Sequence, residues 1–262
     1  MAPDFLNQIL EYKKSLLVQK KAFFAALKQK LGKEKISRYK IFQKAISRPG
    51  QINLIAEIKK ASPSQGLICQ NFDVLKLAKT YTDHQAAALS VLTEDRFFLG
   101  KPDYIKRVSE KFFVPILTKD FIIDEVQIYE TFTCGSSAVL LIVAILRDDQ
   151  LQHLMEVAAN LGMDCLVEVH DEAELKRAVN ARAEIIGINH RNLHTFEVDL
   201  SVSERLVKLI PAGTTIVAES GISRHEEVMK LKDLGAHAVL IGETFIRSPD
   251  VGKKVREVME GK

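Results

Sequence analysis

The sequence has 262 residues, of which 47% are hydrophobic and 27% are charged, so it can bury a sizeable core and is not expected to be disordered. Its longest unbroken apolar run, residues 138–146, has nine residues, less than half of what spans a bilayer. Three widely spaced cysteines without a CxxC pair fit a reducing compartment. We therefore expect a cytoplasmic protein with no membrane partner.

The net charge of +3 is unevenly distributed, because residues 1–50 carry 12 Lys and Arg against 3 Asp and Glu. A basic arm of this kind can bind nucleic acid. The segment lacks aromatic residues interleaved on a basic face, which base stacking would require. We therefore favour a solvated amphipathic helix and expect no nucleic-acid partner.

The N-terminal segment has apolar residues at helical spacing, and Gly32 ends this pattern. The residues of the stripe are Phe5, Ile9, Tyr12, Leu16, Phe23, Leu27 and Leu31. A second short helix is predicted from Ile36 to Ile46, with Pro49 and Gly50 stopping it.

From residue 53 onward, short apolar runs alternate with amphipathic stretches. The predicted strands are residues 53–59, 87–93, 114–119, 138–143, 165–169, 185–189, 215–219 and 238–242. They are rich in Val, Ile and Leu and nearly continuous, as expected for parallel strands buried on both faces. The predicted helices between them include residues 74–81, 124–132, 148–161, 171–180 and 225–234.

Eight strand–helix alternations in roughly 210 residues, about 26 residues per unit, predict a (β/α)₈ barrel. A doubly wound open sheet stays the alternative, since alternation alone does not show closure. We expect one domain, with an N-terminal helical extension over residues 1–48 and the barrel over residues 49–262.

Ionisable or hydrogen-bonding residues stand at the ends of five predicted strands. They are Glu57, Lys59, Lys119, Glu168, Asn189, Arg191 and Glu219. The active site of such a barrel forms at the carboxyl ends of its strands. Structural ion pairs at the barrel mouth are the alternative for any one residue, but five strands together favour a site.

A phosphate pocket is predicted at the last two strands, where the loops commonly present backbone N–H groups to an anion. Ser220 and Gly221 follow the seventh strand, and Gly242, Glu243 and Thr244 follow the eighth. Residues 62–66, Ser-Pro-Ser-Gln-Gly, follow the first strand and could close over the same anion. We therefore expect a small phosphorylated substrate.

The sequence gives little support for a metal or a cofactor. His190 and His194 are four residues apart, but no third ligand completes a metal site. There is no GxGxxG fingerprint and no Walker loop, so no nucleotide cofactor is expected.

Five segments in this order resemble indole-3-glycerol phosphate synthase. They are AEIKKASPS at residues 56–64, LTKDF at 117–121, LVEV at 166–169, GINHRNL at 187–193 and AESGI at 218–222. The resemblance covers essentially the whole chain. It implies a (β/α)₈ barrel that needs no cofactor and converts 1-(2-carboxyphenylamino)-1-deoxyribulose 5-phosphate to indole-3-glycerol phosphate, carbon dioxide and water in tryptophan biosynthesis.

The resemblance also implies roles for particular residues. Lys119 would be the general acid and Glu168 its acid–base partner, with Glu219 at the matching position of the seventh strand. The residues implied to hold the substrate's hydroxyls and carboxylate are Glu57, Lys59, Asn189 and Arg191. Those implied to contact the phosphate are Ser62, Ser220, Gly221, Gly242 and Glu243, and those flanking the aromatic ring are Phe98 and Phe121. We further expect basic neighbours to lower the pKa of Lys119.

Three residues depart from the family's pattern, namely Ala61, Lys101 and Thr118, and they concern the outer phosphate contacts and the edge of the pocket. A rival interpretation is another phosphate-binding barrel enzyme, such as an isomerase of a phosphosugar amine. That enzyme would not need Lys59 and Lys119 together. A monomer is favoured over an oligomer.

Overall fold

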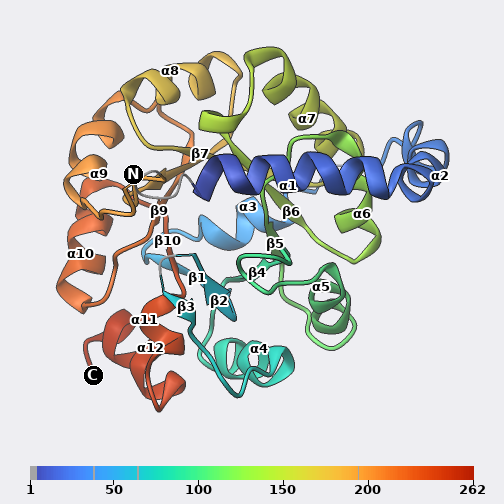
Figure 1. The fold of residues 1–262 in the computed structure, drawn as a ribbon. Coiled ribbons are helices and arrows are strands. Elements are labelled where there is room, and N and C mark those ends of the chain that lie inside the picture. Colours follow the sequence, from blue (N-terminus) through green and yellow to red (C-terminus); the bar gives the residue numbers. More distant parts are fainter. Residues whose placement is uncertain (1–4, 38, 64, 194) are drawn as a thin grey trace.

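The computed structural model describes residues 5–37, 39–63, 65–193 and 195–262. Its eight long strands are all parallel and close into a barrel in the order β1-β10-β9-β8-β7-β6-β5-β4 (Figure 1). They are β1 Asn53–Ile58, β4 Ala88–Leu92, β5 Ile116–Lys119, β6 Ala138–Ile142, β7 Asp164–Val169, β8 Ile185–Asn189, β9 Thr215–Glu219 and β10 Ala238–Ile241. Closure confirms the predicted barrel, and the open-sheet alternative is wrong.

Helices on the outside of the barrel connect successive strands or, in the case of the last two α-helices of the chain, follow the last strand. They are α4 Val74–Asp83, α5 Pro102–Ser109, α6 Glu125–Thr133, α7 Asp148–Asn160, α8 Glu172–Asn180, α9 Ser201–Leu206, α10 His225–Leu234, α11 Glu243–Ile246 and α12 Val251–Glu260, with the short 3₁₀ helices η1 Val143–Ile145 and η2 Val207–Leu209. Side chains of Asp73, Asp124, Asp171 and Asp250 cap the first turns of four of them. A two-stranded hairpin, β2 Ala61–Ser62 with β3 Gly66–Leu67, follows β1.

The N-terminal segment forms three helices, α1 Phe5–Gln19, α2 Lys21–Leu31 and α3 Ile41–Ile46. The predicted helix over residues 36–46 is therefore wrong in its first half. Ile36 donates its N–H to the carbonyl of Asn160 at the end of α7, and Lys40 has a left-handed φ of 51° just before α3. The left-handed residue interrupts helical geometry just before α3, and the hydrogen bond ties the preceding segment to the end of α7.

Two apolar cores hold the molecule together. The larger core lies between the barrel wall and the outer helices. The other core fills the barrel interior, and it includes Leu6 and Ile9 of α1 as well as Phe42 and Ile46 of α3. Figure 1 shows α1 lying across one opening of the barrel, with α2 beside α6. The interior core therefore extends into two N-terminal helices.

The barrel interior is built in layers to which alternate strands contribute. Ile55, Leu117, Leu166 and Val217, on β1, β5, β7 and β9, are fully buried in the interior core. Two residues further along the same strands, and thus on the same side of each strand, stand Glu57, Lys119, Glu168 and Glu219. We call these four residues the ionic layer. An apolar layer thus supports a charged one.

Asp164, at the start of β7, holds α3 in place and carries a stability prediction. Its Oδ2 accepts the N–H groups of Phe42 (3.1 Å) and Gln43 (3.1 Å) in the first turn of α3. Because Asp164→Ala would leave both donors without this acceptor, we expect it to lower the free energy of unfolding by about 2 kcal/mol. Urea denaturation measures the change, with Asp233→Ala, at an exposed position, as control. Equal stability of the two variants would contradict the prediction.

No helix among the described residues is long and apolar enough to cross a membrane.

Candidate active site

The fourteen residues proposed from the sequence all line one cavity of about 150 Å³ at the carboxyl ends of the strands. They are Glu57, Lys59, Ser62, Phe98, Lys119, Phe121, Glu168, Asn189, Arg191, Glu219, Ser220, Gly221, Gly242 and Glu243. The barrel brings them together because parallel strands end at the same rim. Their individual roles stay predictions.

The ionic layer forms the floor of this cavity. The ammonium of Lys119 lies 2.7 Å from Oε2 of Glu168 and 3.0 Å from Oε2 of Glu219. Lys59, directly after β1, donates to Oε1 of Glu57 at 2.6 Å. Asn189 on the neighbouring strand β8 donates to Oε1 of Glu168 at 3.0 Å. The floor thus combines two ammonium groups, three carboxylates and an amide.

The pKa of Lys119 is raised, which contradicts the expectation from the sequence. Burial opposes the charge of this ammonium, but Coulomb attraction by Glu168, Glu219 and Glu57 outweighs the loss of solvation. The expectation was wrong because it assumed basic neighbours, whereas the alternating strands place carboxylates around the lysine. Lys119 is therefore held in its protonated form, as a proton donor must be.

The two carboxylates that share Lys119 have opposite shifts. Burial disfavours the charge of Glu168, but Lys119 and His170 outweigh it, so the pKa of Glu168 lies far below its usual value. For Glu219, burial and the neighbouring charge of Glu168 win over Lys119, and they raise its pKa to about 7. Such a split separates a base from an acid in one site.

Two glycines make room for the carboxylates. A Cβ atom at Gly187 of β8 would lie 2.1 Å from Oε1 of Glu219. A Cβ atom at Gly242, directly after β10, would lie 2.6 Å from Oε1 of Glu57. Gly242 was predicted only as a phosphate contact, but any larger residue there would also displace Glu57.

The predicted phosphate contacts lie at the ends of β9 and β10 and in the β2–β3 hairpin. Ser220 and Gly221 have left-handed φ angles of 70° and 76°, which make a sharp turn, and both residues line the cavity. The hydroxyl of Ser62 is buried without a hydrogen-bond partner among the described residues. Arg191 lies 3.5 Å from Glu243, which also pairs with Arg247. Ser64 lies outside the described residues.

Aromatic and aliphatic side chains form another part of the cavity wall. The rings of Phe98 and Phe121 have centroids 6.1 Å apart, with 40° between their planes. From α1, Phe5, Leu6 and Ile9 also line the cavity. The sequence showed the apolar stripe of this helix but not what it covers, so these contacts were missed.

A buried carboxylate shapes the loop that carries Phe98. Glu94 accepts the N–H groups of Arg96 (3.1 Å), Phe97 (2.7 Å) and Phe98 (2.9 Å). The loop turns tightly at Gly100, where a Cβ atom would lie 2.4 Å from the carbonyl oxygen of Leu92. The position of Phe98 therefore depends on Glu94.

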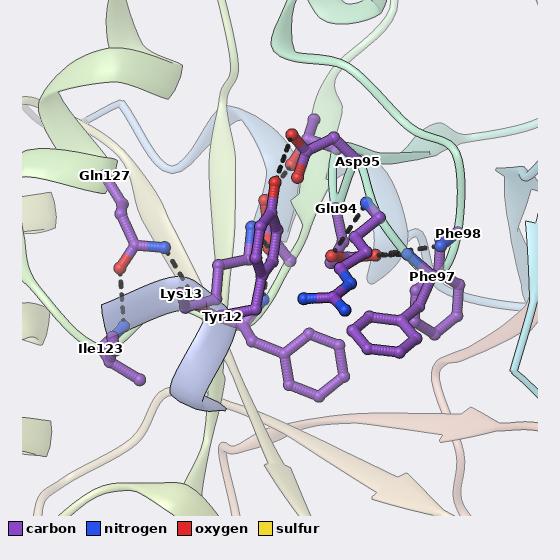
Figure 2. Close-up of polar contacts among 12 residues, drawn as sticks. Tyr12, Lys13, Glu94, Asp95, Phe97, Phe98, Ile123 and Gln127 are labelled. Atoms are coloured by element: carbon purple, nitrogen blue, oxygen red, sulfur yellow. Dashed lines mark hydrogen bonds and ion pairs between the residues drawn. The ribbon is translucent and has the colours of Figure 1, made fainter. Parts of the chain in front are cut away.

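Figure 2 shows α1 facing this same loop. The Tyr12 hydroxyl donates to Asp95 at 2.9 Å, and the guanidinium of Arg96 lies over the rings of Tyr12 and Phe97. Lys13 is buried and lies 2.6 Å from Asp120, the residue after Lys119. Asp120 also accepts the hydroxyl of Thr93 at 2.6 Å. These contacts fasten α1 to the rim of the site.

Replacing Lys13 by methionine should destabilise the protein and weaken substrate binding. The variant leaves the buried carboxylate of Asp120 without its ion-pair partner, which costs about 3 kcal/mol in comparable pairs. We expect a lower Tm and a raised KM, measured by thermal unfolding and steady-state kinetics. The control is Lys14→Met, because Lys14 pairs with Glu11 in an exposed contact. If both variants behave alike, α1 is not held by Lys13.

The three departures from the family's pattern do not line the cavity as far as the structure describes it. Thr118 was expected near the pocket edge, which is wrong. It is buried, and its hydroxyl donates to Ser136 at 2.9 Å outside the barrel interior. Strand alternation explains this, since Thr118 is adjacent to the inward-facing Lys119.

His190, considered as a metal ligand, is hydrogen-bonded to Ser203 (2.7 Å) and to the carbonyl of Ser220 (2.9 Å). His194 lies outside the described residues. Within the described ranges, no group of three or more His, Cys, Asp or Glu side chains could hold a metal ion.

A closed (β/α)₈ barrel with a paired ammonium and carboxylates at its strand ends defines a barrel enzyme of acid–base chemistry. The family model of indole-3-glycerol phosphate synthase matches residues 6–258. The indole-3-glycerol phosphate synthase of Acetivibrio thermocellus is 50% identical over 230 residues, which is 88% of this chain and 88% of that protein. The chain belongs to the indole-3-glycerol phosphate synthase family.

Two further comparisons support the family and the fold, respectively. The indole-3-glycerol phosphate synthase of Lachnoclostridium phytofermentans is 43% identical over 257 residues, covering 97% of this chain and 94% of that protein. Among solved structures, 3-hexulose-6-phosphate synthase from Salmonella typhimurium has a TM-score of 0.66 at 15% identity, covering 80% of this chain and 97% of that one. The latter similarity shows the barrel fold alone.

Proposed function

We propose that the cavity converts 1-(2-carboxyphenylamino)-1-deoxyribulose 5-phosphate to indole-3-glycerol phosphate, carbon dioxide and water. Membership of the family supports this activity, which makes the chain a carboxy-lyase of tryptophan biosynthesis. The observation that carries the assignment to these residues is the ammonium of Lys119 between Glu168 and Glu219 on the cavity floor.

Ring closure requires an aromatic carbon to attack a ketone, which places negative charge on the ketone oxygen. Lys119 is the proton donor for that oxygen, because its carboxylate neighbours keep it charged and the cavity gives it access to the substrate. The charge of Lys59 holds the substrate carboxylate until carbon dioxide leaves. Glu57 orients Lys59 through their contact of 2.6 Å.

Loss of the hydroxyl as water needs a proton donor and a base near the same carbon. Glu168 is the candidate base, because Lys119 and His170 lower its pKa despite burial and so keep its carboxylate ionised and able to accept a proton. Glu219 is suited to hold a proton, because burial raises its pKa to about 7. Asn189 fixes the Glu168 carboxylate by its hydrogen bond of 3.0 Å.

The substrate is held at both ends, which orders its flexible chain for cyclisation. The aromatic ring lies between Phe98, Phe121 and the apolar residues of α1. The phosphate contacts Ser62, the backbone turn at Ser220 and Gly221, and the turn at Gly242 and Glu243. Arg191 lies on the phosphate side, because it contacts Glu243.

The test is incubation of the purified protein with the carboxyphenylamino-deoxyribulose phosphate, followed by the absorbance of the indole product. We expect indole to form without added metal or cofactor. Folded protein that forms no indole would contradict the proposal and favour the rival isomerase of a phosphosugar amine.

A further inference from the structure

His170 is a largely buried histidine directly after β7 that lies between the carboxylates of Glu168 and Glu174. Its Nδ1 lies 2.9 Å from Oε2 of Glu174 in the first turn of α8, and that oxygen also accepts the backbone N–H of His170 at 2.8 Å. Its Nε2 lies 3.4 Å from Oε1 of Glu168. His170 directly follows β7 and is two residues after Glu168 on the chain.

The two carboxylates beside Lys119 have unequal surroundings. Glu168 accepts hydrogen bonds from Lys119 at 2.7 Å and from Asn189 at 3.0 Å, and Nε2 of His170 lies 3.4 Å from its Oε1, within ion-pair distance but without a hydrogen bond. Glu219 shares Lys119 at 3.0 Å, and its Oε1 has no hydrogen-bond partner among the described residues. One ammonium does not balance two buried carboxylates, so a further cation decides which of them keeps its charge.

A protonated imidazole supplies that cation. Two charged groups of the described residues face the ring, Glu168 from β7 and Glu174 from α8. The 3₁₀ helix η1 packs against both β7 and α8, and its residues Val143, Ala144 and Ile145 carry no charge. The N-terminus of α8 disfavours a positive charge here. Burial also opposes it, but the carboxylates of Glu168 and Glu174 outweigh burial and raise the pKa of His170 to about 10.

We propose that His170 is a positioning residue that keeps Glu168 the ionised member of the Glu168–Glu219 pair, with Glu174 holding the imidazole in place. The proposal rests on the function proposed above, because it assigns the base of that reaction. His170 acts through Glu168 and does not line the cavity as described.

The pH dependence of kcat/KM tests this role in His170→Gln. Glutamine can donate a hydrogen bond but carries no charge. Because an ionised Glu168 is required, activity rises as pH passes its pKa, and loss of the adjacent cation raises that pKa. Because the pKa of Glu168 lies far below its usual value in the unaltered enzyme, we expect the variant to raise it toward that usual value. An acid limb absent from the unaltered enzyme's profile should then enter the measured range, or an existing limb should move upward. A merely structural role would lower activity at all pH values without moving this limb.

Glu174→Gln should move the acid limb in the same direction, because the imidazole loses the carboxylate that keeps it charged. The matched control is Glu172→Gln, which makes the same charge change in the same helical turn, at an exposed residue. Its profile should equal that of the unaltered enzyme. An unmoved acid limb in folded His170→Gln, or an equal shift in Glu172→Gln, would overturn the proposal.

A second measurement does not depend on catalysis. The ring nitrogen and carbon NMR signals of His170 in the unaltered full-length protein should show a protonated imidazole throughout the range from pH 6 to pH 8. In Glu174→Gln, the ring should lose its proton at lower pH than in the unaltered protein. A ring that titrates near the ordinary value of about 6.5 overturns the proposal. Failure to form indole would instead contradict the proposed function and leave this NMR result unaffected.

Discussion

Alanine in place of Lys119 should lower kcat by at least about 100-fold, the usual scale for a positioned proton donor. The ammonium of Lys119 lies between Glu168 and Glu219. The other ammonium of the cavity floor, that of Lys59, is paired with Glu57 and does not take its place. Removal of the Lys119 ammonium takes away the donor for the ketone oxygen and leaves two buried carboxylates facing one another. Steady-state rates of indole formation measure the effect.

The control for this variant is Lys101→Ala, because Lys101 is exposed and lies outside the cavity as described. It should retain normal turnover, which also tests the departure from the family's pattern at that position. Thermal unfolding checks that both variants are folded. Turnover by folded Lys119→Ala close to that of the control would falsify the role of Lys119.

Glutamine at position 168 should also lower kcat by about 100-fold or more. The amide has nearly the shape of the carboxylate but cannot accept a proton as a base at neutral pH. It also removes the charge that contributes to holding both Lys119 and His170 in their protonated forms. Kinetics at several pH values measure the loss, and Glu172→Gln is again a control of equal charge change. A variant with nearly normal kcat would rule out Glu168 as the base.

The barrel could be predicted because its strands have an unambiguous pattern. Buried parallel strands are apolar throughout, so residues 185–189 and 215–219 were placed with the observed bounds. The segment before α3 could not be predicted from apolar spacing alone. There, the backbone N–H of Ile36 is donated to the carbonyl of Asn160, and such a distant partner leaves no local signal. The division at residues 48 and 49 stays a prediction.

Those residues of the candidate site that stand at strand ends could be predicted from the sequence. Each residue of the ionic layer is a charged residue at or near the end of an apolar stretch, so it stands out in the sequence. The electrostatics of Lys119 were predicted wrongly because neighbours across a barrel come from alternate strands, far apart in sequence. His170 was missed for a different reason. Its partner Glu174 is only four residues away, but this spacing is too common at helix starts to mark a pair that acts on Glu168.

The ionic layer lies on an apolar layer of the same strands, so the side chains that stabilise the barrel are separate from the side chains at the site. Burying carboxylates and ammonium groups is costly, and apolar residues of similar volume are often as stabilising or more so. The groups that we propose to carry the chemistry are therefore expected to contribute little to the stability of the barrel, which depends more on Ile55, Leu117, Leu166 and Val217 beneath them. Evolution or design can therefore exchange the upper residues for a different set of reactive groups while the lower ring of side chains keeps the scaffold intact.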